Sequence, residues 1–205
     1  MKLYENSATP SCRRVNLFLA ELGETFDIER IHVDARAGEN LTSEFKAKSL
    51  NAKIPTLELY NGDSLCESTA ICRYFAELAG QTDLFGRTAY QKAKVEMWQR
   101  LLELEGITMA FQAFRHLTAT FSDRENCLPE WGEEAKLRLE QFWPKLDAQL
   151  AEHHYVIGDE FTIADISAIV LVEFAMRTQE FDPSEKTPNI DRWFDIVKQR
   201  PAMQG

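Results

Sequence analysis

The stretch Thr9-Pro10-Ser11-Cys12 combines hydroxyls with the expected start of a helix, and so could stabilise a thiolate. Thr9 suits a helix cap and Pro10 suits the first helical position. A helix start offers free backbone N–H groups and the positive end of the helix dipole, which lower the pKa of a thiol placed there. A dithiol site would read Cys-Pro-x-Cys, so the absent first cysteine argues against protein dithiol exchange. A plain helix cap is the structural alternative.

A second candidate site is Lys53-Ile54-Pro55, where a proline opens an apparent central strand. Proline normally does not sit in such a strand, and a cis peptide bond in the preceding turn would resolve the conflict. The backbone of Ile54 would then be free to bind an extended, peptide-like ligand, as an added strand would. The alternative is a strand that simply begins at its proline.

The pair Glu67-Ser68 lies where a strand ends and a helix begins. Ser68 can present its hydroxyl and backbone N–H to a carboxylate, and Glu67 can receive an ammonium. A carboxylate and an ammonium on one carbon are the head group of an amino acid. The alternative is again a helix cap.

A fourth motif, Phe161-Thr162-Ile163-Ala164-Asp165-Ile166, has a structural interpretation. Thr162 as cap and Asp165 three residues later form an acidic variant of the capping box, with Phe161 and Ile166 as a hydrophobic staple. The nearly apolar helix that follows is expected to be central to its domain.

The sequence predicts that an α/β domain and an all-α domain position these motifs. Apolar residues at helical spacing predict helices ending at Gly23 and near Gly80, and Asn61-Gly62 predicts a hairpin. The order β-α-β, then β-β-α, predicts an α/β domain with a small mixed sheet of four strands. The expected strands are residues 2–4, 26–33, 54–59 and 64–67.

From residue 88 onward the pattern is helical, apart from a short possible strand at 154–158. We therefore expect an all-α domain at 88–205 after an α/β domain at 1–80, with a short linker between them. The expected helices cover residues 90–121, 133–153, 162–178 and 190–199.

The composition of the chain argues against several functional classes of protein. The chain has 205 residues, 44% of them hydrophobic, and a net charge of −10, which argues against nucleic acid as the main partner. No apolar run is long enough for a membrane span, and no signal peptide is expected. Four scattered cysteines suggest reduced thiols in a cytoplasmic protein. The histidines show no metal-ligand spacing, so no metal site is expected.

Taken together, the four motifs resemble those of the cytosolic glutathione transferases, and the resemblance covers essentially the whole chain. The stretches SCRRVNLFLAELG and CESTAICRYFAEL are most similar to the theta-related bacterial and fungal branch. The resemblance implies a thioredoxin-like first domain with a cis proline at Pro55, and an α-helical second domain. It also implies glutathione as co-substrate, a small electrophile as partner and a homodimer.

The resemblance leaves the catalytic group open. Theta-like relatives place a serine where this chain has Thr9, and Ser11 follows two residues later. Either hydroxyl could donate to the glutathione thiolate, with Thr9 preferred, while Cys12 is interpreted as a buried small side chain. A third possibility is a bound water held from the second domain by His116 and Ser122.

The resemblance also implies which residues contact glutathione and the electrophile. Glu67 and Ser68 hold the γ-glutamyl end of glutathione, and Ile54 and Pro55 offer backbone to its middle. Lys53 and Asn40 take the glycyl carboxylate, although relatives often carry a histidine where this chain has Asn40. The electrophile site is expected to be apolar, with candidates Phe111, Phe114, Arg115 and Phe121.

Three functions remain open from the sequence. One is a transferase that adds the glutathione thiolate to an electrophilic carbon, and another is a glutathione-dependent reductase of disulfides or peroxides. The third is a non-catalytic binding or regulatory protein on the same fold. The intact Ile54-Pro55 and Glu67-Ser68 features favour catalysis, and the first function is preferred.

Overall fold

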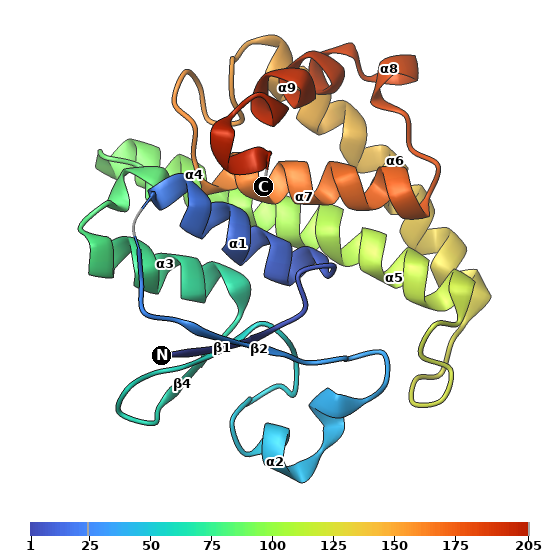
Figure 1. Ribbon diagram of the computed structural model, residues 1–205. Helices are drawn as coiled ribbons and strands as arrows, with labels where there is room; N and C mark the ends of the chain where they lie inside the picture. Colours follow the sequence, from blue (N-terminus) through green and yellow to red (C-terminus); the bar gives the residue numbers. More distant parts are fainter. Residues whose placement is uncertain (24, 205) are drawn as a thin grey trace. The chain divides into compact units, whose positions relative to one another are not determined.

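The computed structural model describes residues 1–23 and 25–204, which form two compact units, Met1–Thr82 and Asp83–Gln204. The first unit carries a sheet and the second is helical (Figure 1). In the described part of the chain, no helix is both long and apolar enough to cross a membrane.

The first unit contains the predicted mixed sheet of four strands, in the order β2-β1-β3-β4. β1 pairs parallel with β2 and antiparallel with β3, and β3 pairs antiparallel with β4 across the Asn61-Gly62 turn. Gly62 has a φ of 85°, a conformation that favours glycine. The strands are β1 (Lys2–Glu5), β2 (Glu29–His32), β3 (Thr56–Glu58) and β4 (Ser64–Cys66).

Helices cover both faces of this sheet. α1 (Pro10–Leu22) and α3 (Ser68–Ala79) pack against each other on one face, and α2 (Ser43–Lys46), preceded by the short η1 (Glu39–Leu41), lies on the other (Figure 1). Phe45 of α2 packs edge-on against Tyr4 of β1 with ring centroids 5.9 Å apart.

Strand β2 is shorter than residues 26–33 had predicted. Phe26 packs on Phe75 of α3, with ring centroids 4.8 Å apart, instead of joining the ladder. Alternating hydrophobicity alone does not distinguish a side chain buried by a strand from one buried by a loop.

The second unit is built around α7 (Ile163–Thr178), whose first ten residues are all buried, as the apolar sequence predicted. α4, α5 and α9 all contact it. The expected strand at 154–158 is a single bridge between Tyr155 and Gly158. The short η2 (Thr82–Phe85) begins at the last residue of the first unit. The other elements are α4 (Ala89–Leu101), α5 (Thr108–Thr118), α6 (Pro129–Ala151), α8 (Pro183–Lys186), α9 (Pro188–Lys198) and η4 (Pro201–Met203).

The predicted long helix at 90–121 contains a π-helical segment, η3 (Leu102–Ile107), between α4 and α5. Gly106 lies in this segment against the second unit's core. A Cβ atom at this position would come within 2.5 Å of Leu171 Cδ2 and 3.2 Å of Phe142 Cε1, so only glycine fits without displacing these side chains.

The capping box of α7 is present as predicted. The Thr162 side chain accepts from the helix backbone, and the fully buried Asp165 accepts from the backbone N–H of Thr162 and Val156 and from the indole N–H of Trp193. These bonds join the start of α7 to α9 and to the preceding loop. Burial raises the pKa of Asp165 to about 6, although its hydrogen bonds lower it.

Asp165 should make the stability of the protein depend on pH. Between about pH 4 and pH 6 the folded carboxyl binds a proton that the unfolded one has released, because 3.8 is the pKa without burial. The free energy of unfolding should therefore fall as pH rises through this window. One pKa unit corresponds to about 1.4 kcal/mol, so the whole change is on the order of 3 kcal/mol.

Urea unfolding of the wild type and of Asp165→Asn across this range would measure the effect. The amide does not titrate, so the difference in stability between the two proteins should change with pH. A constant difference from pH 4 to pH 7 would contradict the assignment.

Candidate functional site

The start of α1 is held by a compact turn. Thr9 is the N-cap residue and Pro10 the first helical residue, as predicted. The Thr9 side chain makes no cap hydrogen bond, however. Its hydroxyl donates to the carbonyl of Asn6 at 2.8 Å, and its backbone N–H donates to the same oxygen. In this conformation the Thr9 proton, which the sequence analysis preferred as donor to the thiolate, is therefore used within the turn.

Ser11 occupies the first turn of α1 and is half-buried. Within the described ranges, no residue forms a hydrogen bond with its hydroxyl. Of the two hydroxyls that the sequence proposed for holding a thiolate, Ser11 is thus the one whose proton is available.

Cys12 is fully buried, as the sequence interpretation expected. Its sulfur accepts from the backbone N–H of Asn6 at 3.4 Å and so ties the turn to the helix. Burial raises the pKa of the Cys12 thiol to about 11, which keeps it protonated at neutral pH. Full burial and a protonated thiol favour a structural role for Cys12 over that of a nucleophile.

The start of α3 carries Glu67 and Ser68 next to a buried guanidinium. Glu67 is exposed and has a φ of 69°, and Ser68, the first helical residue, is buried. Arg14 of α1 donates through one nitrogen to the Ser68 hydroxyl at 2.8 Å and to the Thr69 hydroxyl at 3.3 Å. Because Ser68 accepts from Arg14, its own proton remains available to an anion at the helix start.

The loop before β3 approaches the same helix start. The Ile54–Pro55 peptide bond is cis, Pro55 is buried and the Lys53 side chain is exposed. The Thr56 hydroxyl donates to the Lys53 carbonyl at 2.8 Å, and the Asn51 amide donates to a Glu67 carboxylate oxygen at 2.8 Å. These bonds connect the loop to β3 on one side and to Glu67 on the other.

Asn40, expected to bind a glycyl carboxylate, is half-buried and uses part of its amide within the protein. Its amide nitrogen donates to the Ala52 carbonyl at 2.7 Å, so it braces the loop before β3. Of the two residues assigned to a glycyl carboxylate, Lys53 is the one with an exposed charged group.

Two residues of this region were missed by sequence reasoning, Arg14 and Asn51. Arg14 stands among apolar positions of α1, and an arginine on the buried face of a helix is a signal in itself, because a buried charge requires partners. Asn51 carried no such signal, since asparagine is common in any turn.

In the second unit, His116 has partners for both ring nitrogens. Its Nδ1 accepts from the backbone N–H of Leu128 at 2.9 Å, and its Nε2 lies 3.0 Å from Gln112 Oε1, which also accepts from Trp131. This pattern requires the proton on Nε2 and ties α5 to the start of α6. To hold a catalytic water, His116 would have to give up one of these bonds.

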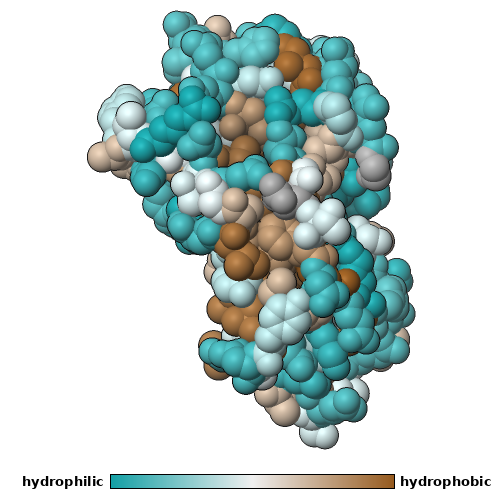
Figure 2. Space-filling model, turned by 60° about the vertical axis from the view of Figure 1, so that its left-hand side comes forward, coloured by the Kyte–Doolittle hydropathy of each residue, from teal (hydrophilic) through white to brown (hydrophobic). Residues whose placement is uncertain are grey.

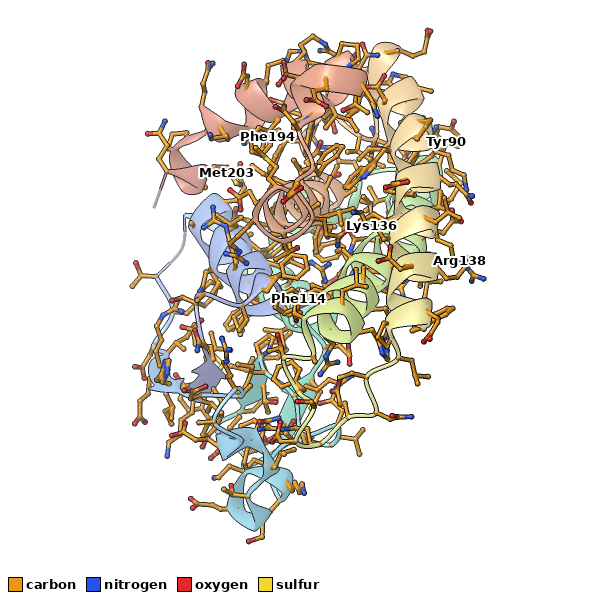
Figure 3. All side chains as sticks on the ribbon, turned by 90° about the vertical axis from the view of Figure 1, so that its right-hand side faces the viewer. Tyr90, Phe114, Lys136, Arg138, Phe194 and Met203 are labelled. Carbon is orange, nitrogen blue, oxygen red and sulfur yellow. The ribbon has the colours of Figure 1, made fainter. Side chains whose placement is uncertain are left out.

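The four predicted electrophile contacts fall into two groups. Phe111 and Phe114 of α5 both pack edge-on against Phe174 of α7, with ring centroids 5.0 and 5.6 Å away, and Phe114 is labelled in Figure 3. Arg115 instead forms an ion pair with Glu125 at 2.5 Å and lies over the ring of Phe121. Arg115 and Phe121 therefore organise the loop after α5.

Comparison with known proteins identifies the family of this chain. Residues 8–78 match the family described as glutathione S-transferase, N-terminal domain, and residues 132–201 match the C-terminal domain of the same family. A curated relative from Saccharomyces cerevisiae, glutathione S-transferase 2, is 30% identical over all of this chain and 88% of its own length. The chain belongs to the glutathione S-transferase family.

Solved structures of Gtt2 members of the family are similar to this chain in sequence and fold. The crystal structure of a glutathione S-transferase of class Gtt2 from Vibrio parahaemolyticus is 46% identical, with a TM-score of 0.88 over all of this chain and 96% of that one. Gtt2 from Saccharomyces cerevisiae is 28% identical, with a TM-score of 0.91 over 100% and 99% of the two chains. The family and the thioredoxin-like first domain predicted from the motifs are confirmed.

The burial of Cys12 predicts which thiols react. Under native conditions an alkylating reagent should modify the half-buried Cys66 and Cys127 well before the buried Cys12 and Cys72. Mass spectrometry of peptides after timed labelling measures this order, and urea-unfolded protein, in which all four should react alike, is the control. Labelling of Cys12 as fast as Cys66 would contradict its structural role.

Proposed function

We propose that this protein is a glutathione transferase that conjugates the glutathione thiolate to small, hydrophobic electrophiles. The observation that carries the proposal is the arrangement at the start of α3, where Ser68 has a free hydroxyl proton and Glu67 an exposed carboxylate. These groups match the carboxylate and ammonium of a γ-glutamyl residue, at a helix start that favours anions.

The start of α1 supplies the thiol chemistry. Free N–H groups and the helix dipole favour a thiolate there, and the Ser11 hydroxyl can donate to it. The protein contributes no reactive thiol at this place, because Cys12 is buried and protonated. The attacking sulfur is therefore that of glutathione. Its thiol proton is released to solvent, the new bond joins sulfur to the electrophilic carbon, and for an aromatic halide the carbon–halogen bond breaks and halide leaves with its electron pair.

The other proposed contacts bind the rest of glutathione and the electrophile. Lys53 is proposed for the glycyl carboxylate and Ile54-Pro55 for the peptide backbone of glutathione. Phe111 and Phe114 are proposed for the electrophile, together with Phe174, which packs against both. A cytoplasmic location is also proposed, which suits a protein with four free thiols among its described residues.

Turnover assays test the proposal. Conjugation of glutathione to an aromatic halide should be readily detected, whereas reduction of a small glutathionylated disulfide should be slow. Dominant disulfide reduction would indicate a reductase. Inactivity in both assays, with no glutathione binding by calorimetry, would indicate a non-catalytic protein.

In the same protein, Ser11→Ala should raise the pKa of the bound glutathione thiol by about 1–2 units. This is the value of one hydrogen bond to a charged group, and the ultraviolet absorbance of the thiolate measures it across pH. Thr9→Val should have a smaller effect, because the Thr9 proton is donated to Asn6. If Ser11→Ala leaves the pKa unchanged while His116→Ala lowers turnover, a water held by the second domain is the donor instead.

We also propose a homodimer, as the family resemblance implied. On the face that Figure 2 shows, hydrophobic residues reach the surface among mostly hydrophilic ones. Tyr90 and Met97, seven residues apart on one face of α4, are 72% and 46% exposed, and Leu104, in the π-helical segment η3 that follows α4, is 61% exposed. Such a stripe fits the same helix of a second copy across a two-fold axis.

Light scattering at micromolar concentration should report a dimer, and Met97→Glu should weaken it by placing a charge in the interface. Leu137→Glu is the matched control, since Leu137 on α6 is 48% exposed. A wild-type monomer, or equal weakening by both substitutions, would contradict the proposed surface.

A further inference from the structure

The loop between α2 and β3 makes a direct hydrogen bond to the proposed γ-glutamyl site. The amide nitrogen of Asn51 donates to one carboxylate oxygen of Glu67 at 2.8 Å, across sixteen residues of sequence. Glu67 itself is exposed, and its side chain would otherwise be free to adopt several rotamers. Among residues 1–23 and 25–204, this bond is the contact that orients the carboxylate.

The orientation of the Asn51 amide is determined by its own partners. Its Oδ1 accepts from the backbone N–H of Lys53 at 3.1 Å and from the Ser49 hydroxyl at 3.3 Å. Since an amide oxygen accepts and an amide nitrogen donates, these contacts leave the nitrogen to face Glu67.

Ser49 in turn is anchored in the first unit. It is buried, and its hydroxyl interacts with the fully buried Thr56 of β3 at 2.9 Å. The amide of Asn51 is thus held at its acceptor end by a chain of polar groups that leads into the sheet. A donor supported in this way can hold a flexible carboxylate at low entropic cost.

We propose that Asn51 is a positioning residue that holds the Glu67 carboxylate ready for the ammonium of the γ-glutamyl group. It uses one carboxylate oxygen and leaves the other for the ligand, since a carboxylate accepts several hydrogen bonds. The inference rests on the proposed function, because it concerns the same glutathione site. It assigns Asn51 to discrimination of the amino group and not to general support of the loop.

The test compares two ligands by calorimetry, glutathione and the analogue in which a glutaryl group, without the amine, replaces the γ-glutamyl group. The ratio of their affinities measures ammonium recognition. In the wild type this ratio should be roughly 10- to 150-fold, as expected for a hydrogen bond between charged groups. Asn51→Ala should reduce it by roughly 2- to 10-fold, the effect of ordering one flexible side chain.

A double-substitution cycle shows whether Asn51 acts through Glu67. Glu67→Gln should reduce the ratio further than Asn51→Ala does, and adding Asn51→Ala to Glu67→Gln should change it no more. Ser68→Ala is the matched control, because it removes a donor to the carboxylate of the ligand and should weaken both ligands alike.

The outcomes separate this inference from the function on which it rests. If Asn51→Ala weakens both ligands equally, or leaves both unchanged, Asn51 is not a positioning residue for the ammonium, while glutathione binding stands. If the wild type binds neither ligand, the proposed function is wrong and the inference is overturned with it.

Discussion

The hydrogen bond from Arg14 to Ser68 joins the two helix starts on which the proposed site depends. A guanidinium buried between α1 and α3 must find acceptors, because leaving a buried charge without them costs several kcal/mol. The first turn of α3 supplies these acceptors as the hydroxyls of Ser68 and Thr69. The helix that carries Ser11 is thereby fixed to the helix that carries the proposed γ-glutamyl contacts, so that a thiol and a head group bound as proposed would lie at a set separation.

Much of the fold in both units could be predicted because its signals are local. Asn61-Gly62 determines a hairpin by turn geometry, and Thr162 with Asp165 determines a helix start by capping. Each depends on residues within four positions of one another. The limits of β2 were not predictable, since the half-buried Phe26 packs on Phe75, forty-nine residues away, and the local pattern does not contain that partner.

Some residues of the candidate site could likewise be predicted from sequence, and others could not. The residues at the helix starts were found from sequence, because helix starts and free hydroxyls can be recognised one motif at a time. The roles of Thr9, Asn40 and His116 could not be predicted, because each hydroxyl, amide or imidazole has several possible partners and only the folded chain selects among them. The distant partner of Asn51 escaped prediction for the same reason.

The π-helical segment Leu102–Ile107 has a consequence for the relation between α4 and α5. A π turn holds more residues than an α turn, so it acts as an insertion absorbed within a continuous helix. Each residue of an α-helix rotates the direction of the side chains by about 100°. Because the wider turn takes up the extra residue, deleting one residue here would restore an ordinary helix and leave the Phe111 and Phe114 face of α5 in nearly the same direction relative to the Tyr90 and Met97 face of α4. The segment thus lets the chain carry an extra residue between the proposed dimer surface and an aromatic face without turning one relative to the other, so relatives that lack this turn would be expected to keep the two faces in the same relation.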